Sequence, residues 1–114
     1  MENQLELNEE RMRLLEKFKQ NLPDVMDAEY KFLNLVYQDG ALSLKIKRLL
    51  SLAIALRAGC TNCIISQTKR AIDAGATKEE VLETLAVEVA MSGTTGIAES
   101  LRVVKLLEEM GHLD

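Results

Sequence analysis

The residues best suited to chemistry are two cysteines separated by two residues, Cys60–Thr61–Asn62–Cys63. Thiols at this spacing can close a disulfide, so the pair can alternate between dithiol and disulfide. Gly59 ends the preceding apolar segment, and the residues that follow the pair have helical periodicity, which places the pair at the start of a helix. Unpaired backbone N–H groups there stabilise a thiolate, whose pKa can fall from about 8.5 to between about 3.5 and 7.5. The pattern predicts redox or thiol chemistry at Cys60 and Cys63.

Two other interpretations of the cysteine pair stay open. Both cysteines could be buried and inert, packing as small hydrophobic residues. A zinc site needs four ligands, or three plus water, and the single histidine, His112, is distant in sequence. We therefore expect no metal unless a second subunit supplies ligands. The chain has no dinucleotide-binding glycine pattern and no Ser–His–Asp arrangement, so we expect no cofactor.

Six helices must position these residues, in one all-α domain spanning residues 1–114. Hydrophobic residues make up 47% of the chain and aromatic residues only 4%, which favours helices packed on an aliphatic core. The first two predicted helices run from about Asn8 to Gln20 and from the cap Asp24 to the break at Asp39–Gly40. The next two run from about Leu44 to Ala58, after the cap Ser43, and from the cysteine pair to Asp73. The last two run from the cap Thr77 to the break at residues 92–96, and from about Ile97 to Met110.

Charge and hydropathy restrict the partners. The formal net charge of −4 argues against nucleic acid, which attracts clustered Lys and Arg. The longest apolar block, Leu49–Leu56, is far shorter than the roughly 20 residues that cross a bilayer, and the polar N-terminus does not resemble a secretion signal. We therefore expect a cytoplasmic protein with no nucleic-acid or membrane partner. In a reducing compartment a cysteine pair is more often redox-active, catalytic or metal-binding than a structural crosslink.

The segments Lys45–Ala53, Ala58–Ile64, Ala71–Thr84 and Met91–Gly93 together resemble the carboxymuconolactone decarboxylase family, which includes the alkylhydroperoxidase AhpD-like proteins. The resemblance extends roughly from Tyr37 to Leu107. It implies an AhpD-like helical fold and a homo-oligomer, often a hexamer built as a trimer of dimers. It also implies an antioxidant, peroxiredoxin-like activity with a redox-active disulfide. In the family's peroxidases the second cysteine takes the sulfenic acid and the first resolves it, roles that fall on Cys63 and Cys60.

The sequence departs from that family at two positions. The family's peroxidases carry a His four residues after the second cysteine, where this chain has Gln67, and a Glu twelve residues before the first cysteine, where it has Arg48. Those Glu and His residues form a proton relay that activates the thiol. Gln does not titrate and Arg stays charged. The chain therefore lacks a general base, whose help is worth about 10²–10⁴ in rate.

Arg48 and Gln67 could tune the site in another way. Arg48 shares a largely apolar helix face, so we expect it to be partly buried and to need an anionic partner. Its candidate partners are a Cys63 thiolate, Glu88 and Glu83. Gln67 lies one helical turn after Cys63, so its amide could hydrogen-bond the sulfur or a substrate oxygen.

The sequence supports three functional hypotheses. The first is a thiol-dependent oxidoreductase acting on a peroxide or a partner disulfide and restored by an unknown thiol reductant. The second is a non-catalytic oligomer, a scaffold or small-molecule binder, motivated by the missing Glu and His. The third is lactone decarboxylation of the kind in the family's name, for which Arg48 offers an anion contact but no clear acid is visible.

Overall fold

The computed structural model describes all 114 residues as six helices without any strand. The predicted all-α, six-helix architecture is therefore confirmed. The helices are α1 (Gln4–Asn21), α2 (Pro23–Val36), α3 (Leu44–Ala58), α4 (Thr61–Asp73), α5 (Lys78–Ser92) and α6 (Thr94–Glu109). None of them has the length and apolar character that crossing a membrane requires.

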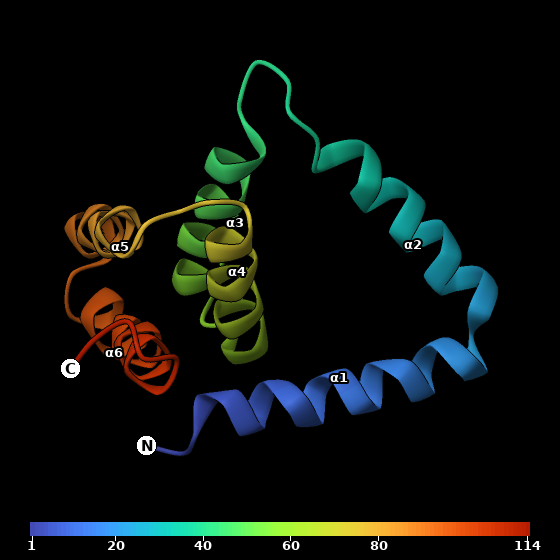
Figure 1. Cartoon of the computed structure of the whole chain (residues 1–114), viewed down its shortest axis with the longest axis horizontal. Helices are drawn as coiled ribbons and strands as arrows, with labels where there is room; N and C mark the ends of the chain where they lie inside the picture. The colour runs from blue at the N-terminus through green and yellow to red at the C-terminus, as the bar shows by residue number, and fades with distance from the viewer.

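Helices α3 to α6 form the body of the molecule (Figure 1). Helix α3 packs along α4, α5 packs along α6, and α5 also contacts α3. The core between them is aliphatic, as the low aromatic content predicts. Its fully buried members include Leu52, Leu56, Ile64, Val103 and Leu107.

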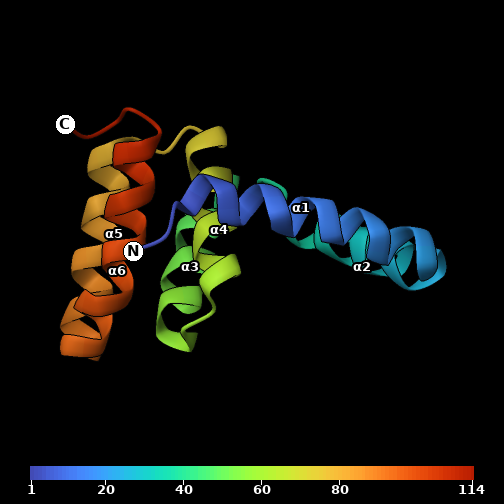
Figure 2. The same cartoon turned by 90° about the horizontal axis from the view of Figure 1, so that it is seen from below.

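Helices α1 and α2 extend away from this body as an arm (Figure 2). Helix α1 touches α4 and α6, whereas the only helix packed against α2 is α1. The segment from Tyr37 to Ser43 then leads the chain back to α3. Several large apolar side chains of the arm, including Phe32 and Leu35, are exposed in the single chain.

Helix α1 begins earlier than the sequence predicts. Asn3, not Asn8, is its N-cap and accepts a hydrogen bond from the Glu6 N–H at 2.9 Å. The N–H groups of Gln4 and Leu5 donate to the carboxylate of Glu109 at 2.9–3.0 Å. The predicted start at Asn8 is wrong because a carboxylate more than a hundred positions away satisfies the first N–H groups of the helix.

The other helix ends follow local rules more closely. Ser43 caps α3, and Thr77 with Glu80 forms the predicted capping box at the start of α5. Asp24 is not a cap, because Pro23 already occupies the first turn of α2. The sequence predicts a break over residues 92–96, but in the structure Gly93 alone separates α5 from α6. Its positive φ of 64° turns the chain directly into α6.

Candidate redox site

The turn between α3 and α4 places the cysteine pair. Gly59 ends α3 in the left-handed conformation, with φ 70° and ψ 28°, which glycine adopts without strain. Cys60 then becomes the N-cap of α4, and its Sγ accepts a hydrogen bond from the Cys63 N–H at 3.3 Å. The predicted position of the pair at a helix start is confirmed. A backbone donor and the positive end of α4 therefore face the Cys60 sulfur.

Cys60 and Cys63 are joined by a disulfide, with their Cα atoms 5.2 Å apart. This separation lies within the usual range for disulfides, so the backbone of the turn already suits the oxidised form. Cys60 is partly buried, whereas Cys63 lies exposed at the surface of the chain. Cys63 is therefore the more accessible residue of the pair in the single chain. The interpretation of both cysteines as buried, inert packing residues does not fit this exposure.

Arg48 and Gln67, the two tuning residues proposed from the sequence, contact each other. Arg48 reaches across from α3, and its Nη1 donates to Gln67 Oε1 at 3.2 Å. Gln67 lies one turn after Cys63 on α4. The structure thus brings together the two positions at which the resemblance leads us to expect a Glu–His relay, although neither residue present can accept a proton at neutral pH.

An aromatic ring also holds the Arg48 side chain. Its guanidinium carbon lies 3.5 Å from the centroid of the Tyr37 ring, a cation–π contact. The Tyr37 hydroxyl is 2.6 Å from the Ser51 Oγ, which fixes the ring in turn. Burial lowers the pKa of Arg48, and the positive charge of Arg70 lowers it further. Arg48 still stays protonated at neutral pH.

The Arg48–Gln67 pair borders a cavity of about 150 Å³ between α4 and the arm. Its polar lining includes Ser66 and three arginines, Arg11, Arg48 and Arg70. Neither Arg11 nor Arg70 was predicted from the sequence. Arg70 could have been found, because it lies seven residues after Cys63 and therefore on the same side of α4. Nothing in the sequence signals Arg11, which comes from the arm.

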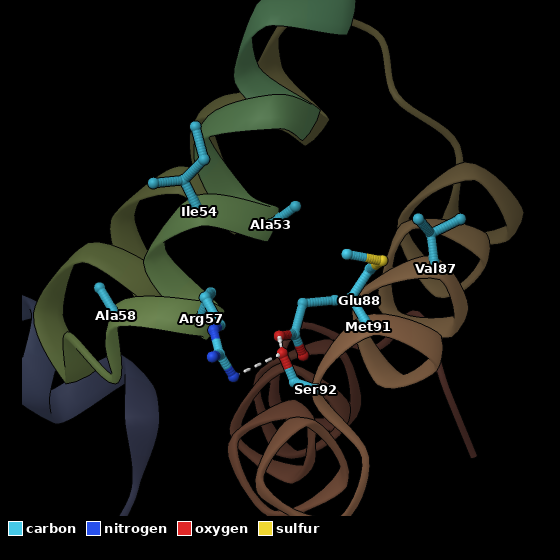
Figure 3. A pocket seen from close by; sticks show the side chains of 8 residues that line it. All are labelled: Ala53, Ile54, Arg57, Ala58, Val87, Glu88, Met91 and Ser92. Atoms are coloured by element: carbon cyan, nitrogen blue, oxygen red, sulfur yellow. Dashed lines mark hydrogen bonds between the residues drawn. The ribbon is translucent and has the colours of Figure 1, made fainter.

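Glu88 belongs to a different part of the molecule. It lines a groove of about 470 Å³ between α3 and α5, together with Ala53, Ile54 and Met91 (Figure 3). Its side chain is only 4% exposed, and it accepts a hydrogen bond from the Ser92 hydroxyl. Arg57 donates to that same hydroxyl at 3.3 Å (Figure 3). Glu88 thus has its own polar partner within the groove.

Glu88, one of the three candidate partners of Arg48, is therefore not its partner. Arg48 turns toward α4 and Tyr37, whereas Glu88 faces Ser92 and the groove. Glu83 is not the partner either, because it is exposed and lines a separate hollow on α5. Arg48 forms no ion pair in the chain, so the expectation of a protein carboxylate beside it fails.

Solved structures share this arrangement of helices. A carboxymuconolactone decarboxylase family protein from Legionella pneumophila superposes with a TM-score of 0.88 at 28% identity, covering 96% of this chain and 97% of that one. A family member from Thermotoga maritima, described as having a possible part in an antioxidative response, gives a TM-score of 0.67 at 29% identity. That match covers 75% of this chain and 88% of the Thermotoga chain.

Sequence comparisons find two further relatives and a family model. An uncharacterized protein from Cupriavidus necator is 34% identical over 74 residues, which cover 65% of this chain and 66% of that protein. A protein of the cox locus of Paracoccus denitrificans is 31% identical over 84 residues, covering 74% of this chain and 76% of that protein. The family model for the carboxymuconolactone decarboxylase family matches residues 23–106. Because that match includes well over half of the chain and both cysteines, this protein belongs to the carboxymuconolactone decarboxylase family.

Proposed function

We propose that this protein is a thiol-dependent oxidoreductase that reduces a peroxide or a partner disulfide with the Cys60–Cys63 pair. The observation that carries the proposal is the position of the pair at the start of α4. There a backbone N–H points at the Cys60 sulfur, and Cys63 is exposed to substrate. The possible antioxidative part described for the Thermotoga maritima relative supports the same chemistry.

In the proposed reaction Cys63 is the nucleophile. Its thiolate attacks one peroxide oxygen, the O–O bond breaks, and the other oxygen leaves as an alcohol or water after taking a proton. The Cys63 sulfenic acid is then attacked by the Cys60 thiolate, which closes the disulfide and releases water. A thiol reductant returns two electrons and two protons to restore the dithiol.

The backbone donor suits Cys60 as the resolving thiol. The Cys63 N–H stabilises negative charge on the Cys60 sulfur and so favours its thiolate. Arg48 and Gln67 would act on Cys63 by charge and hydrogen bonding, because neither can serve as a base. On this proposal the peroxide reaction is slower than in relatives that carry a general base, by up to about 10²–10⁴.

The decarboxylation hypothesis finds less support at this site. A decarboxylase that forms an enolate needs an acid to return a proton. The cavity that Arg48 and Gln67 border is lined by arginines, tyrosines and neutral side chains, and no carboxylic acid lines it. Direct assay of carboxymuconolactone turnover tests the hypothesis, and we expect no product above background.

The first experiment is a redox titration of the native protein in glutathione buffers, with free thiols counted at each potential. We expect a reversible two-electron transition between about −220 and −320 mV. Thiols that stay unreactive until the protein is denatured would refute the oxidoreductase and favour the non-catalytic scaffold or small-molecule binder.

The second experiment assigns the two thiols. Cys63→Ser should abolish peroxide turnover, whereas Cys60→Ser should accumulate a sulfenic acid at Cys63 that a dimedone probe traps. The two variants are matched controls for each other, because each removes one sulfur. A dimedone adduct on Cys60 in the Cys63→Ser protein, formed at the wild-type rate, would reverse the assigned roles.

A further inference from the structure

Three of the six arginines in this chain line one small cavity that Ser66 and Gln67 of α4 also line. They come from three helices: Arg11 from α1, Arg48 from α3 and Arg70 from α4. The cavity measures about 150 Å³, and no Asp or Glu lines it. Positive charge is therefore concentrated here, although the whole chain carries a net charge of −4.

None of these three arginines forms an ion pair. Arg48 donates to the neutral Gln67 amide, Arg11 reaches only the Met12 sulfur at 3.6 Å, and Arg70 makes no side-chain hydrogen bond. By contrast, Arg13 pairs with Glu10, and Arg102 lies within ion-pair distance of Glu2 and Glu99. Each of the three arginines of the cavity is thus without an ion-pair partner in the chain.

The missing counter-charge has an energetic consequence. Like charges around a partly enclosed space repel each other, and the lowered pKa of Arg48 reflects its burial and the charge of Arg70. The nearest carboxylate along α4, Asp73, borders the adjoining hollows with Arg70 but does not come within ion-pair distance of it. An anion placed in the cavity would relieve this repulsion.

The donors of the cavity indicate which anion fits. Guanidinium groups bind the oxygens of carboxylates and phosphates through paired hydrogen bonds. The Gln67 Nε2 makes no hydrogen bond, because Arg48 occupies only the Oε1 of that amide, so it remains available as a further donor. The volume suits one such group rather than a large ligand.

The cavity is also close in the chain to the reactive sulfur. Ser66 and Gln67 line it and lie within one turn of Cys63, and the Ser66 hydroxyl donates to the Cys63 carbonyl oxygen at 3.5 Å. We propose that Arg11, Arg48 and Arg70 bind the carboxylate or phosphate group of the molecule that reacts at Cys63. The proposal that the three arginines bind an anion does not depend on the proposed function. The proposal that the bound molecule reacts at Cys63 does rest on that function.

Binding is tested with inorganic phosphate and with propionate as separate probes of the two anion types. Calorimetric titration and thermal unfolding are measured on the full chain at constant ionic strength, with chloride as the reference anion. At least one probe should raise the unfolding temperature, and Arg70→Gln should weaken its affinity about tenfold or more. Arg13→Gln removes the same charge from an exposed site on α1 and should leave that affinity unchanged.

Selectivity is tested on the reduced protein with two disulfide probes, the anionic dithiobis(nitrobenzoate) and the neutral dithiodipyridine. The Cys63 thiolate attacks a probe sulfur and releases one aromatic thiolate. The Cys60 thiolate then attacks the Cys63 sulfur, closes the protein disulfide and releases the second aromatic thiol, so two electrons pass to each probe molecule. Arg70→Gln should lower the rate with the anionic probe about tenfold and leave the neutral probe unchanged. Arg13→Gln should preserve the ratio of the two rates.

The outcomes separate this proposal from the proposed function. If neither phosphate nor propionate binds more tightly than chloride, or if Arg70→Gln and Arg13→Gln weaken binding equally, the anion site is refuted. If an anion binds as expected but the reduced thiols react with neither probe, the site stands and the oxidoreductase is refuted. Equal loss of rate with both probes in Arg70→Gln would refute the link between the anion site and Cys63.

Discussion

At the residue scale, the contact between Arg48 and Gln67 is the feature that most affects the chemistry. The two side chains come from different helices and lie 3.2 Å apart at their polar atoms. The two positions of the expected relay are therefore in contact, but the chain has placed a permanent cation and a neutral amide there. What the site lacks is a titrating group rather than a position for one.

Restoring titrating groups at these positions should restore acid–base catalysis. The double variant Arg48→Glu with Gln67→His introduces a base one turn after Cys63 and a carboxylate to orient it. We expect peroxide turnover to rise about 10²-fold or more near neutral pH. Stopped-flow measurement of peroxide consumption with the reduced protein gives the rate.

The single variant Gln67→His is the control for this prediction. Gln67→His alone leaves the imidazole beside the Arg48 cation, which disfavours its protonated form, so we expect a smaller gain. A double variant that is folded, reduced and no faster than the natural chain would contradict the idea that only the base is missing.

At the scale of single elements, α5 depends on its first turn. Thr77 Oγ1 accepts from the Glu80 N–H at 3.1 Å, and Glu80 Oε1 accepts from the Thr77 N–H at 2.9 Å. Thr77→Ala removes one of these partners and should lower the free energy of unfolding by about 1 kcal/mol. Urea denaturation followed by circular dichroism measures the change.

A second threonine of α5 provides the matched control. The Thr84 hydroxyl bonds back to the Glu80 carbonyl within the helix, a contact that adds little to helix stability. Thr84→Ala should therefore change the free energy of unfolding by only a few tenths of a kcal/mol. Equal losses from the two substitutions would show that the capping box does not stabilise α5.

The close approach of α5 and α6 depends on Gly96. A Cβ atom at this position would lie 2.5 Å from Glu88 Oε2 and 3.1 Å from the Val89 Cα. Backbone cannot move aside as a flexible side chain can, so Gly96→Ala should cost about 1–3 kcal/mol of unfolding free energy. Gly40→Ala is the control, because a Cβ there would meet only the Lys47 ammonium group at 3.9 Å. If the Gly96→Ala and Gly40→Ala proteins had the same free energy of unfolding, α6 would be able to move away from α5 without loss of stability.

At the scale of the whole molecule, the arm exposes more apolar surface than a lone chain normally tolerates. Three large apolar residues of α2 form what we call the α2 stripe: Val25, Phe32 and Leu35, which are 57%, 61% and 75% exposed. Only α1 packs against that helix. Contiguous apolar surface of this kind marks protein–protein contact. We therefore infer that a second copy of the chain covers the arm, in line with the expected homo-oligomer.

Charging this stripe should break the assembly. We expect the natural chain to sediment at several times its 12.7 kDa mass, with six copies for a trimer of dimers. Phe32→Glu with Leu35→Glu should shift the mass toward smaller species, because an interface core excludes unpaired charge. Lys31→Gln, on the same helix, should keep the assembly. A natural chain that sediments as a monomer would contradict the inference.

The sequence by itself determined the six helices, most of their ends and the position of the cysteine pair. Helix caps, the capping box and the Gly59 turn depend on residues within about four positions of one another. The local sequence therefore predicts them.

Only the tertiary structure decided the neighbours of Arg48 and the presence of the arginine cavity. Arg48 meets Gln67 nineteen positions away, and Arg11 joins the same cavity from the arm. Likewise, Glu109 sets the start of α1 across almost the whole chain. Such contacts depend on the angles at which helices cross and on which charged side chains come close together. A local sequence pattern does not predict either of these. The sequence therefore indicated where the sulfur chemistry sits, and the fold decided what surrounds it.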